Sequence, residues 1–187
     1  MAKTIESSEL IINSDGSVFH LHLKPEQLAD KIILVGDPAR VDLVAEHFDS
    51  IDFTVQSREF RTIGGTLRGE RIMCLSHGIG PDNIDIVVNE LDALANVDFV
   101  TREVKDRRRS LQMVRIGTSG SLQPDIPVGT PVIAVKSIGF DGVLNYYAGR
   151  DEVVDLDYER ALCSHTGWNP LWARPYVVAS DPGLVDQ

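Results

Sequence analysis

Cysteine, aromatic residues and long apolar runs are all scarce in this sequence, and each shortage excludes a class of protein. The 187 residues include two cysteines, Cys74 and Cys163, which stand in no metal-binding spacing. This pattern fits free thiols in a reducing cytoplasm better than a disulfide framework. Apolar runs such as Ile32–Val35 are far shorter than the roughly 20 residues that span a bilayer, and Met1–Leu10 lacks the apolar core of a signal peptide. We therefore expect a cytoplasmic protein with no membrane partner.

Basic residues are also fewer than acidic ones. Lys and Arg number 18 against 28 Asp and Glu, which gives a formal net charge of −10. A nucleic-acid backbone needs a basic protein surface, so nucleic acid is not the expected partner. One segment, Thr101–Ser110, is strongly basic, but it has no interleaved aromatic residues and is predicted to be a solvated loop. A small anionic ligand remains compatible with the charge, since it needs only a few local cations.

The chain is expected to consist of a polar N-terminal lead-in, residues 1–17, followed by one domain over residues 18–187. Hydrophobic residues make up 43% of the chain and charged residues 25%, which is typical of a globular domain. The lead-in is predicted to be mobile. Apolar and polar residues begin to alternate at Val18–Leu23, and this predicts a short strand or an extended arm.

Two units of strand, glycine turn and helix follow. The apolar run Lys31–Val35 predicts a buried strand, Gly36 a tight turn, and Asp37 with Pro38 the start of a helix. A second glycine turn, at 77–81, leads from a strand into another helix. Three strands are expected between the first helix and this second turn, at 51–56, 61–67 and 71–76. The apolar face of the first helix consists of Val41, Val44, Ala45 and Phe48. That of the second helix consists of Ile84, Val87, Val88, Leu91 and Leu94.

Further strands are predicted at 113–117, 131–135 and 176–180. Alternating strands and helices indicate an α/β fold with a mixed, mostly buried sheet. In such folds, ligands bind where strand ends meet glycine turns and helix N-termini.

Three arginines stand in or beside turns of this kind. Arg40 is in the first helical turn after Gly36, where free N–H groups and the helix dipole favour an anion. Arg115 stands inside the apolar strand expected at 113–117, where it is costly to bury without an anion, and the small donors of the loop 117–120 suit phosphate or sugar oxygens. Arg58 joins two strands. Each has a structural alternative: a solvated side chain for Arg40, a carboxylate-paired edge residue for Arg115, and a surface ion pair with the adjacent Glu59 for Arg58.

Other signatures are missing. The P-loop and the Gly-x-Ser-x-Gly nucleophile elbow are absent, and the dinucleotide fingerprint that starts at Gly78 fails at Asn83. His20 is either a structural or a functional histidine, and with His22 it lacks the third ligand of a convincing metal site. The residues by themselves indicate an α/β domain that binds a small phosphate or another small anion.

The order of these motifs resembles the nucleoside phosphorylase family, and most closely its uridine phosphorylases. The motifs are Val18–Leu21, Gly36–Val41, Arg58–Phe60, Gly78–Gly80 and Arg115–Gly120. The resemblance implies a three-layer α/β/α fold around a mixed, barrel-like sheet. It also implies a pentosyltransferase that cleaves a pyrimidine nucleoside, converting uridine and phosphate to uracil and ribose 1-phosphate in nucleoside catabolism or salvage. Phosphate would be a co-substrate, and no cofactor is implied.

The same resemblance assigns roles to individual residues. Gly36, Arg40, Arg58, Arg115 and Thr118 would bind phosphate, with Arg115, Arg40 and Thr118 acting in catalysis. The nucleoside would contact His20, Phe19, Thr118, Ser119 and Gly120.

A shared active site follows from the same assignment. Arg58 and His20 would reach into the neighbouring subunit's site, so a homodimer or a trimer of dimers is expected. In related enzymes the positions of Glu59 and the Ile79 carbonyl can hold a monovalent cation such as potassium, but Asn83 replaces a serine ligand here. Apart from that ion, no metal is expected.

The resemblance stops before the family's base-reading segment and the Met-Glu pair that holds the ribose hydroxyls, so the domain is expected to be incomplete at its C-terminal end. The basic residues near 96–111 are an insertion relative to the family. A purine nucleoside phosphorylase of the same fold is the nearest alternative. A hydrolytic nucleosidase is disfavoured by the three arginines, and a non-catalytic nucleoside-binding protein remains an alternative if the short chain is the mature form.

Overall fold

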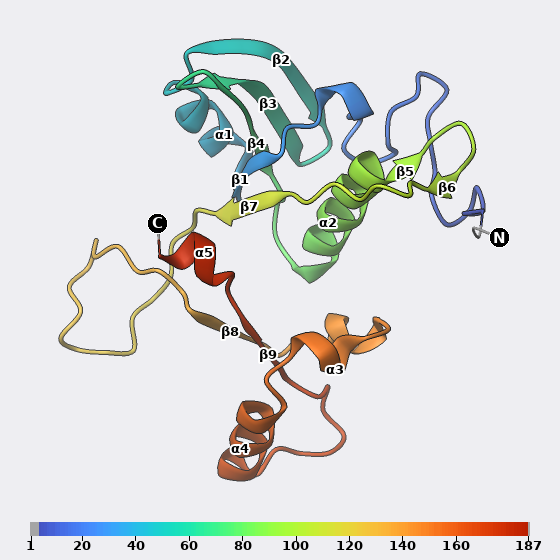
Figure 1. Cartoon of the computed structure of the whole chain (residues 1–187). Helices are drawn as coiled ribbons and strands as arrows, with labels where there is room; N and C mark the ends of the chain where they lie inside the picture. The colour runs from blue at the N-terminus through green and yellow to red at the C-terminus, as the bar shows by residue number, and fades with distance from the viewer. Residues whose placement is uncertain (1–3, 187) are drawn as a thin grey trace. The chain divides into compact units, whose positions relative to one another are not determined.

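The computed structural model describes residues 4–186, and the chain divides after Thr118 into two units, Met1–Thr118 and Ser119–Gln187. The first unit carries a five-stranded sheet with the strand order β2-β3-β4-β1-β7 (Figure 1). The strands are β1 (Lys31–Val35), β2 (Ser50–Ser57), β3 (Phe60–Leu67), β4 (Glu70–Ser76) and β7 (Gln112–Arg115).

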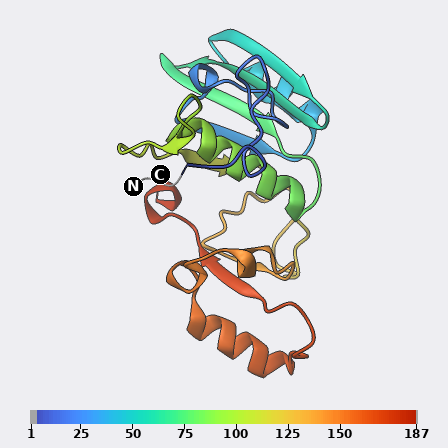
Figure 2. The same cartoon turned by 90° about the vertical axis from the view of Figure 1, so that its right-hand side faces the viewer.

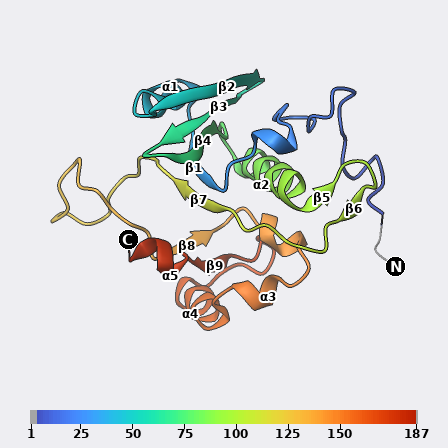
Figure 3. The ribbon, with the colours of Figure 1, turned by 45° about the horizontal axis from the view of Figure 1, so that its top comes forward.

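The sheet is mixed, as the sequence predicts. Strands β2, β3 and β4 form an antiparallel meander, whereas β1 runs parallel to both of its neighbours, β4 and β7. Figure 3 shows β4, β1 and β7 side by side. In this register Val35 lies opposite Ser76, and Leu34 lies opposite Arg115. The carboxyl ends of three parallel strands therefore meet at one edge of the sheet.

Two helices cover opposite faces of this sheet, α1 (Pro38–Ala45) and α2 (Pro81–Asn96). Successive side chains of a strand point to opposite faces. Ile32 of β1 belongs to a buried cluster with Leu91 of α2, whereas Val35 belongs to a second cluster with Val41 of α1. Figure 2 shows α2 running across its face of the sheet. The α/β class and the three layers are confirmed.

Short elements complete the first unit: the 3₁₀ helix η1 (Pro25–Gln27) and a small antiparallel pair, β5 (Val97–Asp98) with β6 (Glu103–Val104). The second unit contains a two-stranded antiparallel sheet, β8 (Lys136–Gly139) with β9 (Tyr176–Ala179), and α4 packs on β9. Its helices are η2 (Val143–Tyr146), α3 (Arg150–Val153), α4 (Leu156–Thr166) and α5 (Pro182–Val185). Among the described residues, no helix has the length and apolar character needed to cross a membrane.

Two predicted extended segments are wrong. Val18–Leu23 is a compact turn rather than a strand, closed by hydrogen bonds from the Val18 amide to the Leu23 carbonyl and from the His22 amide to the Val18 carbonyl. Its backbone amides bond to a side chain of α2, which makes a strand partner unnecessary. The strand expected at 131–135 is also absent, and β8 begins only at Lys136. The partner strand β9 ends at Ala179, opposite Lys136, and the chain turns into α5 at Pro182, although the Val135 carbonyl still accepts from the Ser180 amide.

The predicted basic loop at 101–110 is in part a structural clamp. Arg102 donates to the backbone carbonyls of Ile5, Glu6 and Leu10. The described part of the lead-in, residues 4–17, is therefore bonded to the first unit and does not extend freely from it. One position on the predicted apolar face of α2 is also wrong, since Val88 is 40% exposed.

Candidate functional site

The three parallel strands of the first unit end in adjacent polar turns. Gly36 follows β1 in the centre, His77 follows β4 on one side, and Ile116 follows β7 on the other. The His77 amide donates to the Val35 carbonyl at 2.9 Å, and the Ile116 amide donates to the Leu34 carbonyl at 2.8 Å. The fold thus brings together turns that are far apart in the sequence, at the edge where α/β proteins bind ligands.

The central turn presents the N-terminus of α1. Asp37 caps this helix, with Oδ1 accepting from the Ala39 amide at 2.8 Å, and Pro38 occupies the first helical position. Arg40 follows in the first turn and is partly exposed. A helix N-terminus favours an anion through its free N–H groups and its dipole, and Arg40 adds a full positive charge beside it.

Arg115 is exposed at the end of β7, and its guanidinium has two close neighbours. Its Nε donates to Nε2 of His77 at 2.9 Å. The guanidinium also lies against Gly117, where an added Cβ would stand 2.4 Å from Nη1. Gly117 therefore leaves the space that this orientation of Arg115 occupies.

His77 was not among the residues singled out from the sequence, although it follows a predicted strand. Its side chain is buried, with the residue 4% exposed, and Nδ1 has no hydrogen-bond partner within the described residues. Burial and the neighbouring Arg115 charge lower the pKa of His77 below its ordinary value. The ring lies beside the central turn, because a Cβ added to Gly36 would be 3.9 Å from its Cε1.

The loop after β7 crosses the boundary between the two units. Thr118 is exposed at the end of the first unit, and Ser119 and Gly120 are exposed at the start of the second. Of the residues assigned to phosphate from the resemblance, Gly36, Arg40, Arg115 and Thr118 follow the clustered ends of β1 and β7, whereas Arg58 belongs to a different group.

That second group consists of Phe19, His20 and Arg58. The Arg58 guanidinium carbon lies 5.8 Å from the centre of the Phe19 ring, which is within reach of a cation–π contact. Phe19 and His20 contact each other edge-on, with ring centres 4.9 Å apart. Arg58 has φ of 53° in the two-residue connection between β2 and β3, an uncommon backbone conformation for a side-chain-bearing residue.

Glu90 of α2 holds His20 of this group in place, and the sequence reasoning missed it. Its carboxylate accepts from the backbone amides of His20 and Leu21 at 2.9 and 2.8 Å, and Oε1 lies 2.6 Å from His20 Nδ1. Glu90 is buried between the apolar residues Val87 and Leu91. A carboxylate within the apolar stripe of a helix was the available signal, because a buried charge requires partners.

The oxygens considered for a monovalent cation already have a donor. Asn83 Nδ2 donates to Glu59 Oε1 at 3.0 Å and to the Ile79 carbonyl at 3.3 Å. This amide nitrogen stands between the two oxygens, so as arranged they do not fit an additional ion. The backbone amide of Glu59 and the side chain of Asn83 both donate to the Glu59 carboxylate. These hydrogen bonds lower the pKa of this carboxyl below its ordinary value. Within residues 4–186, no group of three or more acidic, His or Cys side chains is placed to hold a metal.

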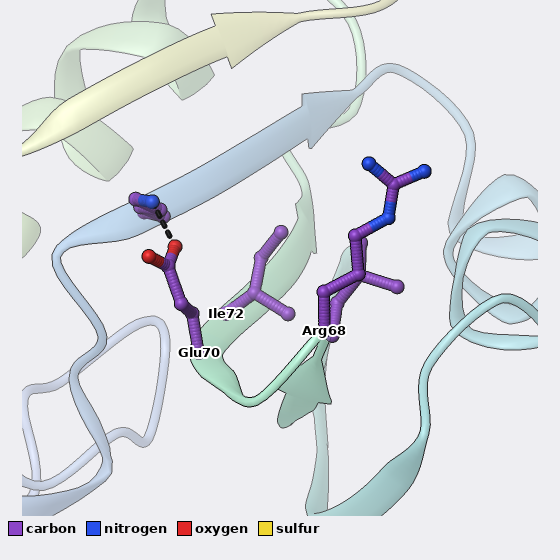
Figure 4. Close-up of a pocket in the computed structure, with 5 residues that line it drawn as sticks. Arg68, Glu70 and Ile72 are labelled. Carbon is purple, nitrogen blue, oxygen red and sulfur yellow. Dashed lines mark hydrogen bonds and ion pairs between the residues drawn. The ribbon is translucent and has the colours of Figure 1, made fainter.

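A hollow in the first unit lies away from these clusters. It is lined by residues at the amino-terminal ends of β1 and β4, including Lys31 and Glu70, whose side chains pair across it (Figure 4). Gly36 and His77 follow the opposite, carboxyl-terminal ends of the same strands. The hollow is therefore not the place where the anion-binding turns meet.

These observations define an α/β protein in which glycine turns, a helix N-terminus and arginines, groups that suit an anion, lie at one edge of the sheet. Residues 30–187 match the family described as the phosphorylase superfamily. The chain belongs to this family.

Similar proteins include uridine phosphorylases from distant organisms. The chain is 36% identical to the uridine phosphorylase of Treponema pallidum, in a match that covers 74% of this chain and 48% of the relative. It is 31% identical to the uridine phosphorylase of Haemophilus influenzae, in a match that covers 88% of this chain and 62% of the relative. A purine nucleoside phosphorylase of DeoD type from Lactococcus lactis is 28% identical, over 89% and 62%.

A solved nucleoside phosphorylase from Trypanosoma brucei, described as showing uridine phosphorylase activity, matches with a TM-score of 0.79. It is 30% identical and covers 95% of this chain and 59% of its own. The chain thus spans about half to three-fifths of the length of the relatives it matches.

Proposed function

We propose that the edge formed by Gly36, Arg40, Arg115 and Thr118 binds inorganic phosphate and that the protein uses it to cleave the N-glycosidic bond of a nucleoside, with uridine as the first candidate. The observation that carries the proposal is the convergence of the α1 N-terminus and the Arg115 guanidinium at the ends of adjacent parallel strands. Membership of the phosphorylase superfamily and the similarity to uridine phosphorylases support it.

The chemistry requires these charges. Phosphate carries about two negative charges near neutral pH, and it attacks a sugar carbon that develops oxocarbenium character as the base departs. Arginines orient this nucleophile and compensate for the loss of its water shell. Positioning and preorganised charge of this kind remove several kcal/mol from a barrier. Since the arginines must not hold the phosphate too tightly to react, stabilisation of the departing base contributes the remainder.

The proposal includes an oligomer with shared active sites. Phe19 contacts both His20 and Arg58, and Glu90 bonds to His20, so these three side chains lie together in one subunit. In the proposed homodimer, or trimer of dimers, this group contributes to the neighbour's site, with His20 and Phe19 at the ribose and Arg58 at the phosphate. The proposal includes inorganic phosphate as a co-substrate and no cofactor. It places no monovalent cation at the oxygens of Glu59 and Ile79, to which Asn83 already donates.

Purine nucleosides are the second candidate substrates. The similarity to the DeoD-type purine nucleoside phosphorylase of L. lactis favours this candidate. Both reactions use the same phosphate edge and differ in the base that leaves.

A base-release assay tests the proposal. The protein is incubated with uridine, thymidine or inosine, with and without phosphate, and the free base and ribose 1-phosphate are quantified. We expect phosphate-dependent cleavage of uridine, whereas preferential cleavage of inosine would favour the purine alternative. Equal base release without phosphate would indicate hydrolysis and would contradict the proposal. Binding of uridine without cleavage under any condition would favour a non-catalytic binding protein.

Two arginine variants assign the phosphate edge. Arg115→Ala is expected to weaken phosphate binding about 10- to 100-fold, since it removes charge-assisted hydrogen bonds. Arg108→Ala is the matched control, because Arg108 is an exposed arginine of the same unit outside both clusters. Equal phosphate affinity in the two variants would remove Arg115 from the site.

A further inference from the structure

A buried histidine lies directly behind the proposed phosphate edge and has no role in the assignments above. His77 follows β4, and its amide is hydrogen-bonded to Val35, the last residue of β1. Its ring is buried next to the Gly36 turn. Nε2 of the ring accepts a hydrogen bond from Arg115 Nε at 2.9 Å, whereas Nδ1 has no partner among the described residues.

We propose that His77 is a positioning residue for phosphate binding: its Nε2 fixes Arg115 Nε, so that the guanidinium lies against Gly117 and keeps its two terminal nitrogens for phosphate oxygens. The inference rests on the proposed function, since it assigns a residue that orients the ligand-binding arginine. His77 itself is buried and does not contact phosphate.

The protonation pattern of the pair supports this role. A guanidinium donates hydrogen bonds and accepts none, so Nε2 of His77 must be the acceptor, and the neutral ring then carries its proton on Nδ1. Nδ1 has no partner in residues 4–186. Arg115 is therefore the group that selects the tautomer of His77, and in return His77 restricts the orientation of Arg115.

The space beside Gly117 also supports the positioning role of His77. The space at Gly117 is filled by the guanidinium, because a Cβ there would lie 2.4 Å from Nη1 and 3.1 Å from Cζ. An arginine has several rotatable bonds, and fixing it in advance lowers the entropy lost on ligand binding. The hydrogen bond to His77 thus restrains Arg115, and the absence of a side chain at Gly117 leaves the space that this orientation needs.

Phosphate titrations of His77 variants test the inference. By isothermal titration with inorganic phosphate, His77→Ala is expected to bind about tenfold more weakly than the unmodified protein. His77→Gln should retain affinity within about threefold, since its amide oxygen reaches the position of Nε2. His77→Asn is the matched control, because its shorter amide reaches only the position of Nδ1, and it should behave like His77→Ala. Equal affinity of all three variants and the unmodified protein would overturn the inference.

A double-mutant cycle separates positioning from a general effect on folding. In an Arg115→Ala background, His77→Ala should cause no further loss of phosphate affinity, because the group it positions is gone. The same additional tenfold loss in that background would show that His77 acts by another route.

The tautomer of His77 gives a readout that does not depend on phosphate. Nitrogen chemical shifts from NMR should show His77 protonated on Nδ1 in the unmodified protein, with population moving to the Nε2-protonated form in Arg115→Ala. An Nε2-protonated ring in the unmodified protein would overturn the inference even if phosphate binds. A protein that shows the expected tautomer but binds no phosphate would instead contradict the proposed function and leave the His77–Arg115 pair established.

Discussion

The two units of the chain are stabilised in different ways. In the first unit, two apolar clusters lie on either side of the five-stranded sheet and contain fully buried residues such as Leu91, Met73 and Cys74. Among the described residues of the second unit, the buried apolar side chains are those of Pro175 and Val177. The second unit instead buries charge, with Arg150 bonded to Glu159 at 2.6 Å, while Trp172 is 59% exposed.

The apolar core of the first unit allows the residues of the candidate site to be held in fixed positions. Close-packed apolar residues hold the strand ends in a fixed register. The turns at Gly36 and His77 directly follow these strands, so their positions are fixed as well. Buried ion pairs contribute less net stability because removing two charges from water is costly. The residues assigned to phosphate all lie in the first unit, so we expect the anion edge to be insensitive to changes in the second unit.

The largest effect is expected from the apolar core of the first unit. Leu91→Ala removes a fully buried side chain between α2 and the sheet and should lower the free energy of unfolding by about 3–5 kcal/mol. Urea denaturation measures the change, with hydrogen exchange of β1 and β4 to locate it. Leu43→Ala is the control, since Leu43 is 58% exposed and its loss should cost less than about 0.5 kcal/mol. Similar costs for the two variants would contradict the assignment of stability to this core.

The next effect concerns the buried charges of the second unit. Glu159→Ala removes the partner of both Arg150 and Arg174, and the buried Arg150 keeps only its bonds to Asp151 and neutral groups. We expect a loss of about 2–3 kcal/mol, seen as faster hydrogen exchange in β9 and α4.

An exposed ion pair of the second unit and the phosphate affinity serve as controls for Glu159→Ala. Asp157→Ala disrupts an exposed ion pair with Arg160 and should change stability by less than about 1 kcal/mol, so an equal effect would show that the burial of Glu159 is immaterial. Loss of phosphate affinity in Glu159→Ala would show that the two units are not independent.

A smaller effect is expected at the start of α4. Asp155 caps this helix by accepting from the Tyr158 amide at 2.9 Å, and it also accepts from Lys136 at 2.6 Å. Asp155→Ala should destabilise the second unit less than Glu159→Ala does, measured by thermal unfolding and by hydrogen exchange of α4. Asp155→Asn keeps a capping oxygen and should cost less; an equal loss would assign the effect to the charge of Lys136 rather than to the cap.

The smallest effect is a difference in pH dependence. The pKa of His77 is lowered by burial and by Arg115, so the unfolded chain takes up a proton first as the pH falls below 6.5. This contribution to the stability of the first unit is complete above that value and is lost progressively below it. The pKa of Asp155 is lowered by its bonds to Lys136 and the Tyr158 amide, so its contribution to the second unit persists until the pH falls below about 4.

Denaturant midpoints at pH 7 and pH 5 measure this difference. His77→Gln should reduce the destabilisation of the first unit between these values, whereas Asp155→Asn should not alter it. An unchanged pH dependence in His77→Gln would show that protonation of His77 is not linked to folding.

The sequence predicted most of the central sheet because its patterns are local. The run Lys31–Val35 is continuous and apolar, and such a run requires burial on both faces. Gly36, Asp37 and Pro38 specify a turn and a helix start through their own backbone chemistry. These features do not depend on distant residues, and they also carried the resemblance to the nucleoside phosphorylases.

Predictions that depended on partners were wrong. The alternation at Val18–Leu23 suggested a strand, but Glu90 provides its amides with acceptors in a turn. Residues 131–135 have the composition of a strand, but the partner strand β9 ends at Ala179 opposite Lys136, and beyond it Ala134 and Val135 bond to Ser180. Arg102 was expected in solvent, yet it bonds to carbonyls more than ninety residues earlier. In each case the conformation was decided by a group that local composition does not reveal.

The sequence alone determined the fold class, the positions of the glycine turns and the arginines that make a phosphate edge chemically reasonable. Only the tertiary structure decided which of these groups meet. The order β4-β1-β7 places His77 beside Arg115, although 38 residues separate them. The packing of α2 against the turn at Val18–Leu23 places Glu90 beside His20 across 70 residues. Parallel pairing of distant strands determines such neighbours, because the register of a sheet is set by its whole apolar core rather than by any one segment.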